Sequence, residues 1–162
     1  MIKHPIEPVY DSNSRILILG SFPSVKSREN LFFYGHPQNR FWKVLAAILE
    51  KDIPETIAEK RSLLLSSGIA LWDVIASCEI TGSSDSSIKH VAPTDLTPIL
   101  ENGQIQCIFV NGKTAMKYFE KYQKKVLQRD AICLPSTSPA NAMWSLERLI
   151  EQWSIIKKYV RT

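Results

Sequence analysis

The 162-residue chain has no apolar run that approaches the ~20 residues of a membrane-spanning helix. Its first residues, MIKHPIEPVY, also lack the apolar core of a secretory signal peptide. These absences speak against an integral membrane protein and predict a cytoplasmic one. A chain of this length can bury a core without disulfides, so we expect a single domain over residues 1–162.

Cysteine and histidine are scarce and scattered along the chain. The three cysteines stand singly, with no CxxC pair, which excludes a disulfide framework and favours reduced thiols. The three histidines form no HExxH motif. We therefore expect neither a metal nor any other cofactor. The residues concerned are Cys78, Cys107, Cys133, His4, His36 and His90.

Glycine-rich phosphate loops are missing as well. No G-x-G-x-x-G occurs, which argues against a dinucleotide-binding fold. Gly112, Lys113 and Thr114 follow a predicted strand as in a P-loop, but Cys107 stands where that motif needs its first glycine. No G-x-S-x-G nucleophile elbow is present either. Any chemistry must therefore rely on amides, a carboxylate and at most one histidine.

The charge of the chain is modestly positive, at +4, and unevenly distributed. Between Lys113 and Arg129 there are six basic residues and a single acid, Glu120. Such a run indicates either a solvated helix face or a surface that faces phosphates, and charge alone leaves both interpretations open.

Short apolar segments alternate with helical ones along the chain. Residues 1–14, which contain two prolines, are expected to form an extended lead-in on the surface, and residues 78–91 the longest polar loop. Apolar patterning predicts strands at 16–19, 68–74, 105–110 and 131–134, and helices at 39–51, 54–66, 94–102, 114–127 and 142–159. This alternation is typical of an α/β domain with a largely parallel sheet.

Each predicted strand ends in a polar loop. These loops hold GSFPS followed by YGHPQNRFW, then WDV, VNGKTA and LPSTSPANA. In a parallel sheet they converge on the carboxyl edge, where open α/β sheets bind ligands. Their aromatic rings suit stacking on a base, and their Ser, Thr and backbone N–H groups suit phosphate contacts. The combination fits a nucleotide extruded from DNA.

GSFPS with YGHPQNRFW, and later LPSTSPANA, resemble motifs of the uracil-DNA glycosylase superfamily, in particular its hypoxanthine-DNA (deoxyinosine) glycosylase branch. The matching segments extend from Gly20 to Ala142. The resemblance implies a three-layer α/β/α sandwich around a four-stranded, mainly parallel sheet. It also implies metal-independent hydrolysis of an N-glycosidic bond.

Within the first loop, the resemblance points to Asn39 as the catalytic residue and to Tyr34 as a ring that stacks on the flipped base. The mismatch-specific uracil glycosylases, a related branch, have a water-positioning Asn where this chain has Phe22. The resemblance to the hypoxanthine branch indicates that Asn39 takes over the task of that missing Asn. An amide oxygen can orient a water while the sugar develops oxocarbenium character. On the residues alone, Asn39 can equally cap the following helix, and Tyr34 can pack in the core.

Three further residues are candidates for base binding. The best-known members of the superfamily keep a uracil-reading Asn at about the position of Asp73, whose ionised carboxylate can accept the N1–H of hypoxanthine. His36 can donate to the leaving base, and Asn111 can line the pocket. Each of the three also has a structural alternative. Asp73 can cap a helix or orient a loop, and His36, which is beside Pro37, can shape a turn, as can Asn111.

The predicted DNA contacts come from hydroxyls and from the second motif. Ser136 and Ser138 resemble its phosphate-pinching serines, and Asn141 and Met143 lie in the region that wedges into the duplex in relatives. Met143 can alternatively begin a core helix. The full predicted set is Ser21, Ser24, Ser136, Ser138, Asn141 and Met143.

The sequence thus predicts a monofunctional DNA glycosylase acting as a monomer on double- or single-stranded DNA that contains a deaminated base, hypoxanthine or uracil. It departs from the best-known members at Leu134, where they have a histidine that assists the leaving base. These departures suggest one alternative, a catalytically inactive nucleic-acid-binding module of the same fold. A second alternative is a nucleosidase that uses the same loops on free nucleosides.

Overall fold

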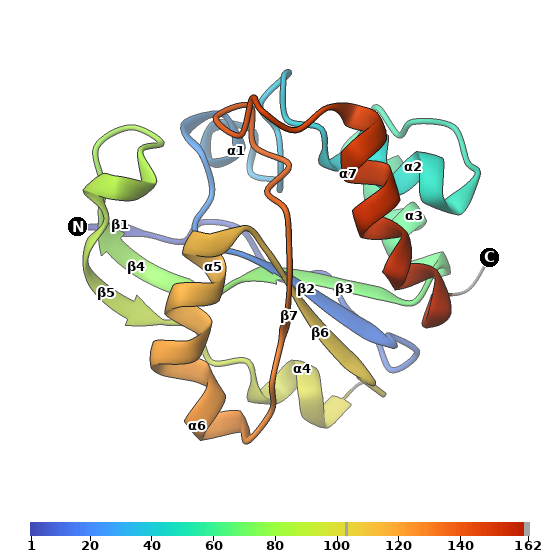
Figure 1. Cartoon of the computed structure of the whole chain (residues 1–162). Coiled ribbons are helices and arrows are strands. Elements are labelled where there is room, and N and C mark those ends of the chain that lie inside the picture. The colour runs from blue at the N-terminus through green and yellow to red at the C-terminus, as the bar shows by residue number, and fades with distance from the viewer. Residues whose placement is uncertain (103, 161–162) are drawn as a thin grey trace.

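Four parallel strands form the centre of the molecule, in the spatial order β3-β2-β6-β7 (Figure 1). The computed structural model describes residues 1–102 and 104–160. All four predicted strands are present, and their ends differ from the predicted ones by at most two residues. Their bounds are β2 (Ile16–Gly20), β3 (Ile69–Asp73), β6 (Cys107–Asn111) and β7 (Ile132–Leu134).

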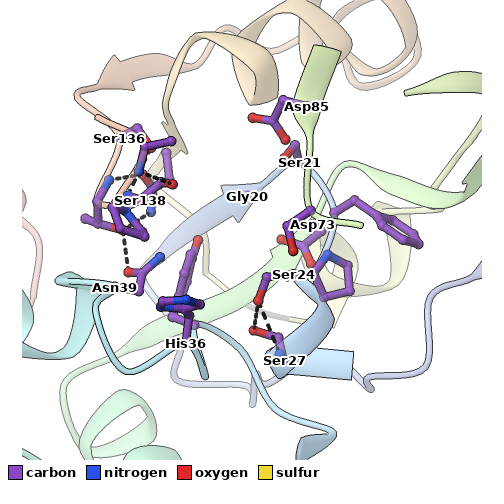
Figure 2. A pocket seen from close by; sticks show the side chains of 18 of the residues that line it. Gly20, Ser21, Ser24, Ser27, His36, Asn39, Asp73, Asp85, Ser136 and Ser138 are labelled. Atoms are coloured by element: carbon purple, nitrogen blue, oxygen red, sulfur yellow. Dashed lines mark hydrogen bonds between the residues drawn. The ribbon is translucent and has the colours of Figure 1, made fainter. Parts of the chain in front are cut away.

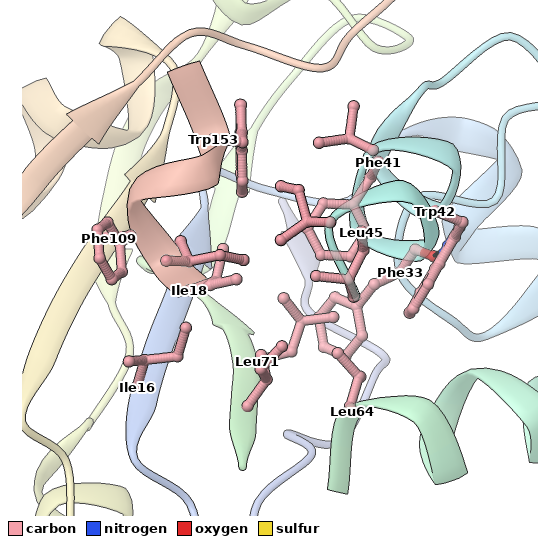
Figure 3. Close-up of a cluster of buried hydrophobic side chains, with 14 of the residues drawn as sticks. Ile16, Ile18, Phe33, Phe41, Trp42, Leu45, Leu64, Leu71, Phe109 and Trp153 are labelled. Atoms are coloured by element: carbon pink, nitrogen blue, oxygen red, sulfur yellow. Dashed lines mark hydrogen bonds between the residues drawn. The ribbon is translucent and has the colours of Figure 1, made fainter. Parts of the chain in front are cut away.

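Helices cover both faces of this sheet, which confirms the predicted three-layer α/β/α sandwich. Ile16 and Ile18 of β2 face one core, and Leu17 and Leu19 face the other, because alternate side chains of a strand point to opposite faces. The first core is covered by α2 (Phe41–Leu49), α3 (Ile57–Ser66) and α7 (Leu146–Trp153), as Figure 3 shows. The second is covered by α4 (Thr97–Asn102), α5 (Lys113–Tyr118) and α6 (Lys124–Leu127).

The helices differ from the prediction in three places. The helix predicted over 114–127 contains a π-helical stretch, η2 (Phe119–Gln123), between α5 and α6. The last helix is shorter than predicted, because α7 gives way to a 3₁₀ turn, η3 (Ser154–Lys158). A short helix, α1 (Val25–Asn30), was not predicted; the Ser24 hydroxyl caps it by accepting the N–H of Ser27 at 3.2 Å. Gly103, expected just past the end of α4, lies outside the described residues.

A second, antiparallel sheet corrects two predictions. It has the order β1-β4-β5 and consists of β1 (Ile2–Lys3), β4 (Ile75–Glu79) and β5 (Lys89–Pro93), with a 3₁₀ turn, η1 (Asp85–Ser87), in the hairpin. The hairpin falls in the segment that was predicted as a loop. Its second strand was not predicted because β5 is mostly exposed and lacks apolar alternation. The lead-in does not lie on the surface: Ile6 and Val9 are buried, and Val9 pairs with Leu71 of β3.

Candidate active site

A pocket of about 470 Å³ lies at the carboxyl end of the parallel strands (Figure 2). Gly20, Asp73 and Asn111, at the ends of β2, β3 and β6, line it together with the loops that follow. The structure therefore brings the predicted segments to one edge of the sheet. Of the predicted site residues, those that line the pocket are Ser21, Ser24, Tyr34, His36, Asn39, Asp73, Asn111, Ser136 and Ser138.

Gly20 allows two side chains to approach the end of β2 closely. A Cβ at this position would overlap Oδ1 of Asp73 and would lie 3.0 Å from the hydroxyl of Tyr34. Any larger residue would displace one or both groups, so the glycine is needed here for close packing and not for its backbone freedom.

The Asp73 carboxylate is fixed by a hydrogen bond to His4, a residue for which no functional role was predicted. Oδ2 of Asp73 accepts a hydrogen bond from Nε2 of His4 at 2.7 Å, and the side chains of the pair are only 5% and 4% exposed. The imidazole lies among the rings of Phe22, Phe33 and Trp72. No sequence motif marks His4, because its partner lies 69 residues away.

The hydrogen bonds of His4 define its tautomer. The backbone N–H of Ile6 donates to Nδ1 at 3.2 Å, so Nδ1 is an acceptor and Nε2 carries the proton that is donated to Asp73. The main chain of Asp73 is fixed as well, because its carbonyl accepts the hydroxyl of Thr94 at 2.8 Å. In the described part of the chain, Oδ1 of Asp73 has no hydrogen-bond partner, and it borders the pocket.

Tyr34 contributes a ring to the pocket wall and a buried hydroxyl. Its ring stacks on Phe41 with centroids 4.1 Å apart, whereas Phe32 and Phe33 pack into the core. Among the described residues, the hydroxyl finds no hydrogen-bond partner. Burial, with the nearby Asp73 carboxylate as a smaller cause, raises the pKa of Tyr34 well above its usual range, although the Asn111 amide opposes the shift. The phenol is therefore neutral at physiological pH.

Asn39 belongs to a chain of side-chain hydrogen bonds that crosses the pocket rim. Nδ2 of Asn111 donates to Oγ1 of Thr137 at 3.0 Å, and Thr137 donates in turn to Oδ1 of Asn39 at 2.9 Å. Oδ1 of Asn39 also accepts the N–H of Phe41 at 2.9 Å, at the start of α2. Both lone pairs of Oδ1 are thus occupied, and the amide nitrogen is the polar atom left to face the pocket (Figure 2). Thr137 itself was not among the predicted site residues.

Arg40, next in sequence, organises the loop after β7. Its guanidinium donates to the carbonyls of Ser138 at 3.0 Å, of Asn141 at 3.1 Å, and of Trp144. Its backbone N–H donates to the carbonyl of Thr137 at 3.1 Å. A guanidinium presents several N–H groups in a fixed plane, which suits it to collect carbonyls that converge. Sequence analysis did not single out this residue.

The serines of that loop hold its turns. The Ser136 hydroxyl accepts the N–H of Ser138 at 3.1 Å, and the Ser138 hydroxyl accepts the N–H of Ala140 at 3.1 Å, so each hydroxyl proton is left to donate elsewhere. Asn141 lies outside the pocket lining and donates from Nδ2 to the carbonyl of Ser136 at 3.0 Å. Met143 also lies outside it and is 88% exposed; the alternative that it begins a core helix is wrong, since α7 starts at Leu146.

His36 has the turn-shaping role that was its structural alternative, and it also lines the pocket. Its Nδ1 accepts the backbone N–H of Gln38 at 3.1 Å, which shapes the turn. The neutral ring then carries its proton on Nε2, as a donor at the pocket wall.

The serine-rich hairpin loop forms the far wall of the pocket, a role that the sequence analysis missed. It is attached to α1, because the Ser83 hydroxyl accepts the N–H of Val25 at 2.9 Å and the Gly82 carbonyl accepts the guanidinium of Arg28 at 2.6 Å. Asp85 of this loop lines the pocket; partial desolvation of its carboxyl raises the pKa although the residue is exposed, and the nearby Thr114 and Ser21 hydroxyls oppose the shift.

Two absences hold for residues 1–102 and 104–160. No group of three or more His, Cys, Asp or Glu side chains lies together in a way that could bind a metal ion. None of the helices has the length and apolar composition needed to cross a bilayer.

Comparison with known proteins accounts for this architecture. Residues 7–158 match the model of the uracil DNA glycosylase superfamily. The chain belongs to this superfamily. A protein named hypoxanthine DNA glycosylase from Methanosarcina acetivorans is 32% identical over 98% of this chain and all of its own length. A protein of the same name from Methanosarcina barkeri is 32% identical over 73% of this chain and 76% of its own.

The fold comparison agrees. A solution NMR structure of a candidate uracil DNA glycosylase from M. acetivorans superposes with a TM-score of 0.81, is 32% identical, and covers 96% of both chains. These matches confirm the family that the loop motifs predicted. They also confirm the predicted activity class: the protein is a DNA glycosylase, a hydrolase whose substrate is DNA.

Proposed function

We propose that this protein is a monofunctional DNA glycosylase that flips a deaminated base, hypoxanthine in first place and uracil in second, and hydrolyses its N-glycosidic bond. Membership of the superfamily and the names of the Methanosarcina relatives support this substrate class. The observation that carries the proposal is the fixed side chain of Asn39, which lines the pocket with its Nδ2 unengaged by any described residue.

Asn39 holds the attacking water in this mechanism. The amide oxygen was expected to perform that task, but Oδ1 already accepts from Phe41 and Thr137. Nδ2 therefore donates to the water oxygen and fixes its position. No base is needed at this residue, because the bond to the nucleobase breaks first and the sugar develops oxocarbenium character that a neutral water can attack with its other lone pair. The proton that the water loses is taken up by the departed base anion. The products are the free base and an abasic site.

The flipped base is bound by its face and by its edge. Tyr34, backed by Phe41, offers a ring on which the base stacks. Oδ1 of Asp73 accepts the N1–H of hypoxanthine or the N3–H of uracil. Asn111 holds Thr137 and lines the same pocket.

The leaving base receives its hydrogen bond from His36. Leu134, at the position of the histidine in the best-known members, is buried and apolar and cannot assist. His36 is the one histidine among the described residues lining the pocket, and its Nε2–H is free to donate to the base as negative charge develops. No lysine is found among these lining residues, which supports hydrolysis without a Schiff-base intermediate.

Contacts to the DNA backbone come from the hydroxyls at the pocket rim. Ser21, Ser136 and Ser138 donate to phosphates on either side of the flipped nucleotide. Ser24, whose hydroxyl donates to Oγ of Ser27 at 3.0 Å, joins them only by giving up that bond. Met143, exposed on the loop that Arg40 braces, enters the space left in the duplex, and Asn141 shapes that loop. One chain supplies all of these groups, so we propose that a monomer, a single glycosylase domain, is sufficient.

Single-turnover kinetics on labelled duplexes test this function. Duplexes containing deoxyinosine, deoxyuridine or neither are incubated with excess protein, and alkali reveals abasic sites. We expect cleavage of the deoxyinosine duplex that Asn39→Ala abolishes. Tight duplex binding without any cleavage would instead identify the inactive binding module, and hydrolysis of free deoxyinosine in preference to the duplex would identify a nucleosidase.

A further inference from the structure

We propose that His4 is a positioning residue for base selection: its Nε2–H fixes the Asp73 carboxylate so that Oδ1 meets the base as a hydrogen-bond acceptor. This inference rests on the proposed function and deepens it, because it names what sets the orientation of the base-reading group. Nothing in the loop motifs includes His4, which precedes β2 and lies 16 residues before Gly20.

The geometry restrains His4 on every side. Nδ1 is held by the N–H of Ile6, Nε2–H is held by Oδ2 of Asp73, and Phe22, Phe33 and Trp72 confine the ring. Turning the ring over would put the Cδ2–H against the Ile6 N–H and the Cε1–H against Oδ2 of Asp73, so both hydrogen bonds would be lost. The imidazole therefore presents one fixed donor to one oxygen of the carboxylate.

A carboxylate that is anchored through one oxygen has only the other left for a ligand. Oδ1 of Asp73 lies where a Cβ on Gly20 would overlap it, and it makes no hydrogen bond with any described residue. Both residues line the pocket. Without His4, no hydrogen bond would hold Oδ2, and the angle at which the carboxylate plane presents Oδ1 to a ligand would no longer be fixed. The orientation of the acceptor is thus a property of the pair and not of Asp73 alone.

A fixed acceptor separates bases by the edge that they present. Hypoxanthine carries N1–H, a donor, where adenine carries an unprotonated nitrogen with a lone pair. Oδ1 attracts the first and repels the second. A site built around a hydrogen-bonding group rejects the base that leaves this group unpaired, because a buried polar atom then loses its partner.

A purely structural role for His4 would be to fasten the N-terminal segment, but the backbone already does this. The His4 N–H donates to the Ala76 carbonyl at 2.7 Å, and Ile2 pairs with Cys78 in the antiparallel sheet. Val9 exchanges hydrogen bonds of 3.0 and 2.8 Å with Leu71. These bonds need no imidazole, so the side chain is left to serve the carboxylate.

The test compares equilibrium affinities for two duplexes that cannot be cleaved. One carries hypoxanthine and the other unsubstituted purine, whose N1 is an acceptor; both have a 2′-fluoroarabino sugar, which disfavours the oxocarbenium ion. We expect the wild type to prefer hypoxanthine by about ten- to a hundredfold, the range of a hydrogen bond to a charged group. His4→Phe should bring this preference close to one, and His4→Gln, which keeps an N–H donor, should restore most of it.

The control is His90→Phe, which breaks a similar pair whose two residues do not line the pocket. Nδ1 of His90 lies 2.7 Å from Oε2 of Glu79, with both side chains well exposed. We expect it to leave the preference unchanged. Should His4→Phe fail to fold, His4→Asn, whose side chain is too short to reach Oδ2, takes its place.

Two outcomes would overturn the inference. One is a loss of affinity in the His4 variant by the same factor for both duplexes, which is what a structural role produces; the other is a wild type without preference. The proposed function fails separately, if wild-type protein releases no hypoxanthine from cleavable deoxyinosine duplex.

Discussion

Asn39 and Thr137 are 98 residues apart in the chain, yet their side chains meet in a hydrogen bond of 2.9 Å. The bond joins the loop after β2 to the loop after β7, and Asn111 extends it to the end of β6. Three strand ends are thereby linked through side chains at the pocket rim. Because Oδ1 of Asn39 also accepts the N–H of Phe41, the first residue of α2, the same residue serves the fold with its oxygen and faces the pocket with its nitrogen.

Because the oxygen and the nitrogen of the Asn39 amide have different roles, two substitutions of Asn39 should give different results. Asn39→Asp keeps an oxygen for the Phe41 N–H and the Thr137 hydroxyl but removes the Nδ2 donor. We expect a single-turnover rate lower by about a hundredfold or more, with thermal stability near that of the wild type. Asn39→Ala should lose the rate and also about 1 kcal/mol of stability, because the Phe41 N–H and the Thr137 hydroxyl lose their acceptor. An Asn39→Asp variant with wild-type rate would contradict the role of Nδ2.

Gly20→Ala should impair base binding more than folding. The new Cβ would overlap Oδ1 of Asp73, and displacing the carboxylate should cost about 1–3 kcal/mol of stability, as overpacking commonly does. Activity on deoxyinosine duplex should fall at least tenfold. Gly68→Ala is the matched control: its φ of +75° makes a side chain strained there too, but it lies away from the pocket lining. Equal losses of activity in both variants would refute the packing argument.

Tyr34→Phe should be tolerated, whereas Tyr34→Ala should not. Removing a buried hydroxyl without a partner in the described residues should raise the free energy of unfolding by about 1 kcal/mol or leave it unchanged. The ring that stacks on Phe41 remains in Tyr34→Phe, so affinity for deoxyinosine duplex should persist. Loss of the ring in Tyr34→Ala should weaken it by about 1–3 kcal/mol. Chemical denaturation and fluorescence anisotropy measure the two quantities, and a large activity loss in Tyr34→Phe would give the hydroxyl a direct role.

Arg40→Lys should loosen the loop that carries Ser138 and Met143. A lysine ammonium cannot span the three carbonyls that the guanidinium collects, so we expect a loss of about 2 kcal/mol in stability. Limited proteolysis should then cut within residues 138–144 faster than in the wild type. Arg61→Lys, on the exposed side of α3, provides the comparison and should change neither quantity.

The sequence was sufficient to predict those parts of the fold that depend on the pattern of apolar and polar residues within short segments. Four apolar strands and their polar ends were sufficient for the parallel sheet, the pocket edge and most of its lining, because each strand end carries its residue to one edge. Phe22 and Leu134, which replace polar groups of relatives, were also recognised, and the structure shows both as buried apolar side chains.

What the sequence did not reveal depends on partners distant in the chain. His4 acquires meaning only when β1 pairs with β4, and Arg40 only when the loop after β7 folds back on α2. β5 was missed since its exposed residues show no apolar alternation. The interruption of the helix after β6 by a π turn likewise coincides with a tertiary contact: Nε2 of Gln123 donates to the buried Thr94 carbonyl at 2.8 Å.

The hydrogen bond from His4 to Asp73 has a consequence for any redesign of the base specificity of the pocket. An amide in place of the carboxylate has two unlike ends, and the fixed Nε2–H of His4 pairs only with its oxygen. Asp73→Asn would therefore settle in one orientation, with its NH₂ toward the base, and the polarity of the reading group would reverse. The protein thus carries its own device for orienting a designed amide, and a single substitution is enough to convert a receptor for N–H into one for a nitrogen lone pair.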